Sequence, residues 1–495
     1  MYSEIDTAQL EKAGDYVLSD IELVSFQAAD GSNPKRISIR SLVSEVNIYE
    51  GLDQKNLSGT VILTDAQNVV GHLPLTGFER IEFKMFTPGT SRGYDFTFDT
   101  GHPMFIYKIA DRTGVSPRTQ MYKLHFCSAE MIQNEQVKVE RAFTDTYDNN
   151  VLSVFRNELK SKKTMIVEET AGIRKYTSPK IRPFEVIDEF SKNAQSKIFT
   201  NAGMMFYETA IGYHFQSIES MLAISNGVAR PVQAKYTPKP ANIRDSRGNR
   251  DVVKEMQTVV KFQINEQFNT LKNLRNGVYN ARVITHDNYN KTFSEVDFDY
   301  AETYSNSFHT EHDGKGGLQD NKSIMPLFNY KDNKFFSQFP QGTQYMVSTT
   351  ENVHTDIERV PHEVNLPKRL SQRLAFETMS LTITVPGFTG ISVGDLVAFE
   401  MPSYEPSGVD NPLDLDPYMS GRYLIKSIRH KITTGEDRHE MVIDIVKDSV
   451  HTGYPQENIN TLDTRENAEA INILKYDLDD ALLENTEGDG VFKWS

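Results

Sequence analysis

The sequence has one cysteine, Cys127, and one tryptophan, Trp494. A single cysteine excludes an intramolecular disulfide and a zinc site built from several thiolates. A single tryptophan argues against a carbohydrate-binding β-protein, because such a protein would expose several aromatic platforms.

Positive charge is also scarce: 53 Lys and Arg stand against 68 Asp and Glu, which gives a net charge of −15. This balance argues against general nucleic-acid binding and against docking on an anionic membrane, both of which need a cationic surface. No apolar run approaches the ~18 residues that would span a bilayer. The polar start of the sequence has no signal-peptide pattern, so we expect no membrane insertion and synthesis in a cytoplasm.

What is present is a long chain with many aromatic residues. Its 495 residues predict about three domains at ~150 residues each. From about residue 20 to 129, apolar and polar residues alternate, as in Ile81, Phe83 and Met85. The same alternation returns from 381 to 450. Alternation with one apolar face predicts strands of antiparallel sheets or barrels.

Between these regions the period changes to that of a helix. Val151, Val154, Phe155 and Leu159 would share one helix face, with Asp148 and Asn149 as plausible N-caps. A second helix is predicted to begin at Pro183-Phe184, because proline suits a first helical turn. Residues 140–228 are therefore typical of a small α/β domain.

The remaining segments are polar. Residues 229–254 carry three prolines among basic residues and predict a connecting segment, and 290–375 predict an insertion. The last 45 residues are acidic, and 470–483 could form an amphipathic helix. That segment is either a solvated tail or a docking element for a partner.

The two strand-rich regions resemble each other, which suggests an internal duplication. Three segments match in the same order, although alternating strands inflate such matches. Duplicated sheet units suggest a pseudo-symmetric assembly. The matched segments are 56–65 with 273–287, 77–88 with 394–402, and 105–124 with 423–444.

Candidate chemistry is sparse. His309-Thr310-Glu311-His312-Asp313 is the most metal-like cluster, but the glycine-rich Gly314-Lys315-Gly316-Gly317 after it predicts a loop without oriented ligands. That glycine run lacks the spacing of a phosphate loop. Asp410, Asn411, Asp414 and Asp416 offer oxygen ligands but lack the EF-hand spacing, so a solvated loop is favoured.

The other reactive side chains are expected to pack rather than react. Cys127 lies in an alternating strand, which favours a buried thiol. The histidines in or beside strands, which are His72, His125, His430 and His439, favour packing roles. No enzyme signature stands out, and we expect no catalytic, cofactor-binding or metal-binding residues.

An ordered set of segments resembles the baseplate hub proteins of contractile-tailed bacteriophages. The resemblance covers roughly residues 20–230 and 256–450, and no single motif in it is diagnostic. It is carried by Ile48-Tyr49-Glu50, residues 57–65 and 73–77, Tyr107-Lys108-Ile109, residues 124–130, 182–187, 421–425 and 441–448.

The resemblance implies a structural, non-enzymatic virion protein of the tail baseplate, assembled in the host cytoplasm. Such hubs carry two tube-like β-barrel domains per chain, and three chains form a pseudo-hexameric ring. The ring adapts the sixfold tail tube to the threefold central spike and lets DNA pass. Implied partners are two further copies, the spike, the tail tube or tube-initiator protein, and possible tape-measure and baseplate wedge proteins.

The predicted fold is α+β and mainly β, with two tube-like antiparallel β-barrels, a small α/β domain and a polar insertion. The predicted boundaries are 1–138 for an N-terminal extension with the first barrel, 139–235 for the α/β domain, 236–289 with 376–452 for the second barrel, 290–375 for the insertion, and 453–495 for an acidic extension.

Three alternatives stay open at this point. A tube initiator or distal tail protein would need one tube domain per chain rather than two. A cell-wall-degrading or sugar-binding baseplate component would need a catalytic cleft or aromatic platforms.

Within the hub interpretation, the net charge of −15 gives the hypothesis that the ring lumen is acidic, so that DNA is repelled and slides.

Overall fold

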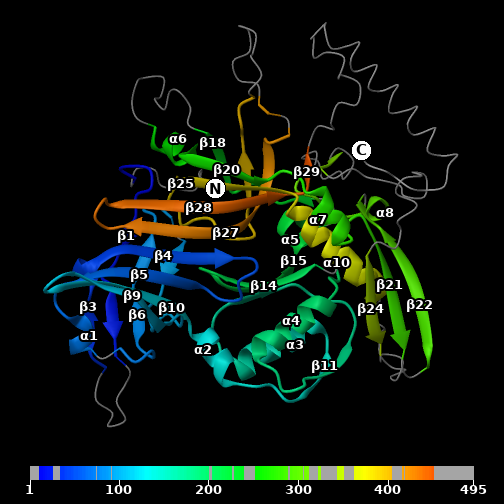
Figure 1. Ribbon diagram of the computed structural model, residues 1–495, viewed down its shortest axis with the longest axis horizontal. Coiled ribbons are helices and arrows are strands. Elements are labelled where there is room, and N and C mark those ends of the chain that lie inside the picture. Colours follow the sequence, from blue (N-terminus) through cyan, green and yellow to red (C-terminus); the bar gives the residue numbers. More distant parts are fainter. Residues whose placement is uncertain are drawn as a thin grey trace, which may run out of the picture. The chain divides into compact units, whose positions relative to one another are not determined.

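The computed structural model describes residues 10–25, 34–73, 75–90, 92–199, 203–225, 228–238, 251–287, 290–304, 306–311, 322–324, 343–349, 362–403, 415–416 and 418–450. Strands predominate over helices in these residues (Figure 1), so the mainly β prediction is confirmed. The predictions for 314–317, 410–414 and 470–483 lie outside the described residues. No helix in the described part is long and apolar enough to cross a membrane.

The first strand-rich unit is built on the N-terminal alternating segments. Its strands pair in the order β4-β5-β10-β9-β6-β2-β3, and β1, β7 and β8 form a separate small sheet. Alternate side chains such as Val46, Val61 and Leu124 form one buried core. The elements are β1 (Val17–Leu18), β2 (Glu22–Val24), β3 (Arg36–Ser38), a 3-10 helix (Arg40–Leu42), β4 (Val43–Gly51), β5 (Ser58–Asp65), α1 (Val69–His72), β6 (Arg80–Glu82), β7 (Lys84–Phe86), β8 (Gly93–Asp95), β9 (Met104–Ser116) and β10 (Thr119–Ser128).

The second strand-rich unit repeats this order as β20-β25-β28-β27-β26-β18-β19. Its core includes Leu381, Ile383, Ile443 and Ile445. Its elements are β18 (Ala234–Pro238), α6 (Val252–Met256), β19 (Thr258–Val259), β20 (Lys261–Glu266), β25 (Met379–Pro386), β26 (Leu396–Phe399), β27 (Gly421–Thr433) and β28 (Arg438–Lys447).

The five strands β4-β5-β10-β9-β6 therefore correspond one by one to β20-β25-β28-β27-β26, and neighbours are antiparallel throughout both sets. This agreement supports the duplication inferred from sequence. One difference lies at the end of the path, where β2 is antiparallel to β6 but β18 is parallel to β26.

Each unit curves back on itself through one stretch of chain. In the second unit β19 is followed, after Val260, by β20, and the Val260 N–H donates to the Thr384 carbonyl at 2.8 Å. In the first unit the chain runs from β3 through the 3-10 helix into β4. The end strands of each path are thus joined by the chain, and they are not paired with each other by hydrogen bonds.

The structure corrects two of the sequence matches. Residues 273–287 do not correspond to β5, because β21 (Asn280–Asp287) pairs with β22 (Thr292–Asp299) and β24 (Gln344–Thr349) in a separate sheet. Met441 is fully buried, whereas Met121, its predicted counterpart, is 40% exposed. The matching buried residue is Tyr122, one position further on. Since strand side chains have a period of two, a slip of one residue exchanges the two faces of a strand.

The α/β domain follows β10. The predicted second helix is confirmed as α4 (Pro183–Asn193), which buries Phe184, Ile187 and Phe190. The first helix, α3 (Tyr147–Ser153), has Thr146 at its N-cap position rather than Asp148 or Asn149, and it continues as a π-helix over Val154–Glu158. The other elements are α2 (Ala129–Gln136), β11 (Ala142–Asp145), β12 (Met165–Val167), β13 (Arg174–Thr177), β14 (Met204–Thr209), β15 (Gly212–Ser217), α5 (Ile218–Leu222), β16 (Ala223–Ser225) and β17 (Val228–Ala229).

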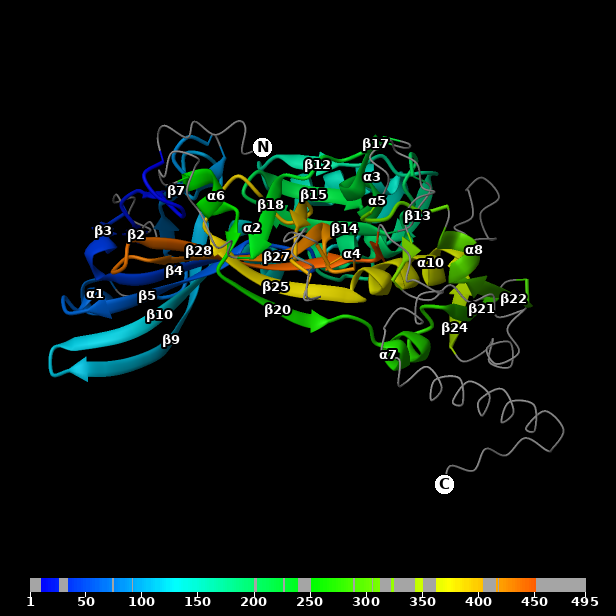
Figure 2. The ribbon, with the colours of Figure 1, turned by 90° about the horizontal axis from the view of Figure 1, so that it is seen from above.

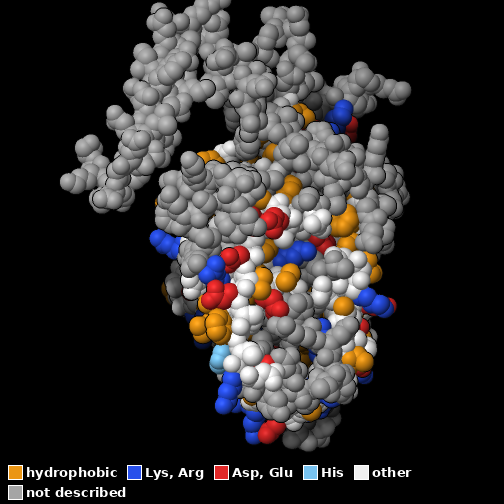
Figure 3. Space-filling model, turned by 90° about the vertical axis from the view of Figure 1, so that its right-hand side faces the viewer, with side chains coloured by type: hydrophobic (Ala, Val, Ile, Leu, Met, Phe, Trp, Pro, Cys, Tyr) orange, Lys and Arg blue, Asp and Glu red, His pale blue; other side chains and the backbone are white. Residues whose placement is uncertain are grey.

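The insertion has a small core of its own, which includes Val278, Tyr300 and Ala375. Its described elements begin with α7 (Thr270–Arg275) and β21, whereas the predicted limit of 290 left β21 in the second unit. Figure 3 faces this side, where Lys, Arg, Asp and Glu are intermixed with hydrophobic side chains. The remaining elements are α8 (Tyr300–Tyr304), β23 (Lys322–Ser323), α10 (His362–Phe376) and β29 (Ser449–Val450).

Candidate assembly surface

One strand pair joins the two units. Residues 45–51 of β4 pair antiparallel with residues 427–433 of β27. Strand β27 has 13 residues, so one side pairs with β28 while the other pairs first with β26 and then with β4. The result is one continuous antiparallel sheet in the order β9-β10-β5-β4-β27-β28-β25-β20, in which β27 and β28 lie beside β4 and β5 (Figure 1).

The two faces of this eight-stranded sheet differ. One face is covered by the cores of the two units. The other, which we call the bare face, carries polar groups bonded across the strands. On it the Arg429 Nε–H donates to Asn47 Oδ1 at 2.9 Å, and Ser427 Oγ donates to Asp444 Oδ2 at 2.6 Å. Lys431 Nζ lies 3.5 Å from Glu45 Oε2. A polar face of this extent is stable in water or against a polar ligand.

A buried carboxylate holds three parts of the chain together behind the junction. Glu50 of β4 accepts hydrogen bonds from Tyr94 Oη at 2.8 Å, from the Ala210 N–H of the α/β domain at 3.0 Å and from the Val393 N–H of the second unit at 3.2 Å. Burial raises the pKa of Glu50 to about 7, against the lowering effect of these donors. The group positions the two units and the α/β domain rather than acting on a substrate, because it is 1% exposed.

A second buried cluster ties the α/β domain to the first unit. Lys163 Nζ lies 2.8 Å from Glu130 Oε2 and 2.6 Å from Glu208 Oε1, and all three side chains are buried. Glu208 also accepts the Leu57 N–H at 2.7 Å. Burial lowers the pKa of Lys163, but the two carboxylates raise it by more than burial lowers it. The pKa is therefore above its usual value, and the ammonium stays charged.

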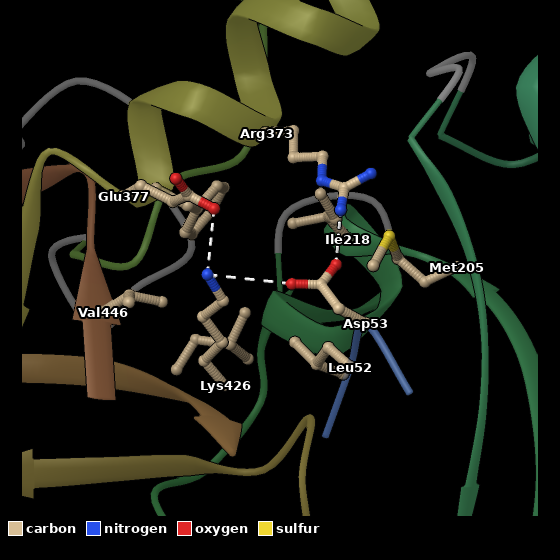
Figure 4. A pocket seen from close by; sticks show the side chains of 10 residues that line it. Leu52, Asp53, Met205, Ile218, Arg373, Glu377, Lys426 and Val446 are labelled. Atoms are coloured by element: carbon tan, nitrogen blue, oxygen red, sulfur yellow. Dashed lines mark hydrogen bonds and ion pairs between the residues drawn. The ribbon is translucent and has the colours of Figure 1, made fainter. Parts of the chain in front are cut away.

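Where the two units, the α/β domain and α10 meet, a cavity of about 40 Å³ lies below an ionic rim (Figure 4). Apolar side chains such as Leu52 and Met205 line it. On the rim Asp53 pairs with Arg373, and Lys426 Nζ lies 2.9 Å from Glu377 Oε1. The volume suits a water molecule or two rather than a substrate, and these ion pairs brace the meeting point.

The two ends of the eight-stranded sheet are free edges. Among the described residues, no strand pairs with the outer side of β9 beyond Tyr107 or with the outer side of β20. In Figure 2 the hairpin of β9 and β10 projects from the rest of the described chain. Val115 on β9 is 62% exposed and Ile264 on β20 is 40% exposed. Exposed edges with apolar side chains are templates for pairing with another chain.

The candidate metal cluster from the sequence has a structural role. His309 is buried, with Nδ1 2.7 Å from Asp448 Oδ2 and Nε2 2.8 Å from the Tyr304 carbonyl. Burial alone would lower the pKa of His309, but Asp448 raises it above its usual value. The backbone N–H of Glu311 donates to Ser449 Oγ at 2.9 Å, which ties the same segment to β29. His312 and Asp313 lie outside the described residues.

Of the other singled-out residues, His72 is exposed, so the packing role predicted for it is wrong, and the following ones are packed or bonded locally. Asp416 accepts the N–H groups of Tyr418 and Met419 at 2.9 and 2.8 Å. His430 and His439 stack in the core, with Nδ1 of the former 3.1 Å from Nε2 of the latter. Burial raises the pKa of Cys127 to about 12, which keeps its thiol protonated. In the described part of the chain, no three His, Cys, Asp or Glu side chains form a metal-binding group.

Sequence patterns do not indicate that β4 pairs with β27, or that Glu50 and Lys163 are buried. β4 and β27 are far apart in the chain, and Lys163 lies in the basic run Lys160-Ser161-Lys162-Lys163, which is typical of a solvated surface. Buried and partly buried residues alternate only in the second half of β27, from Ile428 to Thr433, so the sequence did not show that this strand is long enough to pair with two others.

The chain is similar to a phage baseplate protein over most of its length. It is 23% identical over 417 residues to a probable baseplate hub protein of Vibrio phage KVP40, which covers 80% of this chain and 88% of that protein. The resemblance to baseplate hub proteins is confirmed. No family model matches the chain.

Solved structures of tail proteins are more distant. A tail protein from Neisseria meningitidis MC58 is 11% identical with a TM-score of 0.46, covering 88% of this chain and 97% of that chain. A tail protein of prophage MuSo2 from Shewanella oneidensis is 10% identical with a TM-score of 0.48, covering 87% and 98%. At these scores the likeness carries no weight in the assignment.

Proposed function

We propose that the chain is the structural hub of a phage tail baseplate and acts by assembly, not catalysis. Three copies would form a ring of six strand-rich units between the sixfold tail tube and the threefold central spike, and DNA would pass through it. The observation that carries the proposal is the eight-stranded sheet, in which two units of the same strand order are joined edge to edge within one chain. The similarity to a probable hub protein over 80% of this chain supports it.

The duplication distinguishes this proposal from a tube initiator. A protein with one tube unit needs six chains to make six units, whereas this chain supplies two units. The spike, the tube or tube initiator, and the tape-measure and wedge proteins are the partners that such a ring would meet. The insertion and the α/β domain would then face partners other than the tube.

We expect the purified full-length chain to assemble into rings of three. Three chains of 56.3 kDa give about 169 kDa, which native mass spectrometry separates from a single chain or six chains. Negative-stain images should show a central hole, and adding the spike protein should leave three chains per ring. A six-chain ring would favour the tube initiator, and a single-chain mass with and without the spike would contradict the hub.

A further inference from the structure

We infer that the chain binds phosphate in a second cavity, where α10 meets α4 and the loop between β4 and β5. This cavity has a volume of about 70 Å³. Since one water molecule needs only ~10–15 Å³ of such space, the cavity has room for a tetrahedral ion. The inference does not depend on the number of chains in the assembly.

Charged side chains from three parts of the chain meet at this cavity. Helix α10 contacts α4, and the loop between β4 and β5 makes ion pairs with both helices. The cavity shares Asp53 and Arg373 with the smaller cavity of Figure 4. Its wall has more cations than carboxylates. The charged residues are Lys55, Arg369 and Arg373 against Asp53 and Asp188.

On the α4 side, the carboxylate already has two cations. Asp188 Oδ1 lies 3.5 Å from Lys55 Nζ, and Asp188 Oδ2 lies 3.0 Å from Lys192 Nζ. Burial raises the pKa of Asp188, but the two ammonium groups lower it by more, so the carboxylate is charged. Its charge is thus already compensated without a third cation.

On the α10 side, Asp53 is also paired twice. Nη2 of Arg373 donates to Asp53 Oδ1, and Asp53 Oδ2 lies 3.7 Å from Lys426 Nζ (Figure 4). The other terminal nitrogen of Arg373 points away from Asp53 in the same view. Arg373 therefore keeps N–H donors for a further acceptor.

Arg369 is the cation of the wall that has no partner. In the part of the chain that the structure describes, its guanidinium makes no hydrogen bond or ion pair, and it lies one helical turn from Arg373. Burial and the nearby Arg373 lower the pKa of Arg369, against the raising effect of Asp188. Charged groups that are largely removed from water are normally paired, so this site is short of one anion.

The mixed wall selects phosphate among the oxyanions. A guanidinium offers parallel N–H donors to such an ion, and Arg369 and Arg373 together offer two guanidinium groups. The carboxylates of Asp53 and Asp188 would repel an ion that only accepts hydrogen bonds, such as sulfate or acetate. Phosphate at pH 7 keeps at least one O–H, so it accepts from the arginines and donates to a carboxylate.

Thermal unfolding of the full chain, in chloride and phosphate buffers of equal ionic strength, tests the site. Sodium phosphate should raise the Tm of the wild type in a saturable way, because a ligand that binds only the folded chain stabilises it. R369Q should weaken phosphate binding by about tenfold or more. The matched control is R118Q, which removes an exposed arginine from the turn between β9 and β10 and should bind phosphate like the wild type.

Two further measurements exclude a general loss of stability and a nonspecific salt effect. Without phosphate, R369Q should be at least as stable as the wild type, because it removes a cation that has no partner. Sulfate and acetate should bind the wild type more weakly than phosphate. Glycerol phosphate separates the sources: a Tm shift equal to that of phosphate assigns the phosphate group of a larger molecule, a smaller shift assigns the free ion, and either result supports the site.

Three outcomes would overturn the inference. They are an equal phosphate shift in R369Q and the wild type, an equal shift of the wild type with sulfate, and a lower stability of R369Q without phosphate. The last would show that Arg369 already has a partner. None of these results bears on the ring of three chains, which the native mass decides.

Discussion

Replacing Lys163 with methionine should lower the free energy of unfolding by about 3–5 kcal/mol, because it removes one partner of a buried ion pair and leaves charges uncompensated. Lys163 Nζ is the cation between Glu130 and Glu208, whose side chains are 5% and 0% exposed. Methionine fills a similar volume, so the loss reports charge rather than a cavity.

The effect should be large because the cluster connects two cores. Glu208 lies on β14 of the α/β domain and accepts the Leu57 N–H and the Ser128 hydroxyl of the first unit. Ser161 Oγ donates to Glu130. With the ammonium gone, two carboxylates would face each other in the interior, and one of them would have to take up a proton or move towards water.

Urea unfolding at pH 7, followed by circular dichroism, measures the loss. The matched control is K162M, one residue away on the exposed side of the same run, which should change stability by less than about 0.5 kcal/mol. Removing both carboxylates as well, in K163M/E130Q/E208Q, should recover part of the loss. A K163M protein within 1 kcal/mol of the wild type would show that the cluster does not stabilise the fold.

Lys163 also illustrates what the sequence could and could not predict. Local patterns were sufficient for α4, because Pro183 and the spacing of Phe184, Ile187 and Phe190 act within one helix. They were sufficient for strands with one buried face, such as β25, but not for β14 and β15, which are buried on both faces. Lys163 differs because its burial depends on Glu130 and Glu208, which only the fold brings near.

Register is the second property that local patterns left undetermined. Met121 and Tyr122 are both apolar, so the sequence did not decide which of them corresponds to Met441, and the structure shows that the buried one is Tyr122. The strand 280–287 alternates as well as β5 does, yet it pairs with β22 and β24. Which alternating segments pair is decided by tertiary packing, and the β4–β27 junction is the clearest case.

Acidification from pH 6.5 to pH 5 should destabilise the protein through the buried histidine pair behind this junction. His430 and His439 are 0% and 1% exposed, and burial lowers the pKa of His430 to about 3 and that of His439 well below 6.5. Tyr94 packs on His430 at 5.1 Å between ring centres, and Tyr16 packs on His439 at 6.1 Å.

The sign follows from the proton balance. Below pH 6.5 the unfolded chain binds protons at both histidines while the folded chain does not, so stability is fully present above pH 6.5 and falls with the pH. Each histidine contributes a slope of about 1.4 kcal/mol per pH unit. Glu50 acts in the opposite direction, because its folded pKa of about 7 lies above the usual 4.5 and its folded form takes up a proton first. His214, whose pKa burial lowers to about 4, adds to the loss, so the histidines outweigh the one glutamate and acidification lowers the stability.

Urea unfolding of the wild type and of single variants at pH 5.0, 5.5, 6.0 and 6.5 tests this balance, because each variant removes one titrating group. H430Q should reduce the slope of stability against pH by about 1.4 kcal/mol per unit, whatever its stability at pH 7. H72Q, at an exposed position beside β5, should leave the slope as it is in the wild type. E50Q should steepen the loss by a similar amount, because it removes the opposing group. An unchanged slope in H430Q would mean that His430 is already protonated in the folded chain, and the junction would then have to hold a buried cation beside Tyr94.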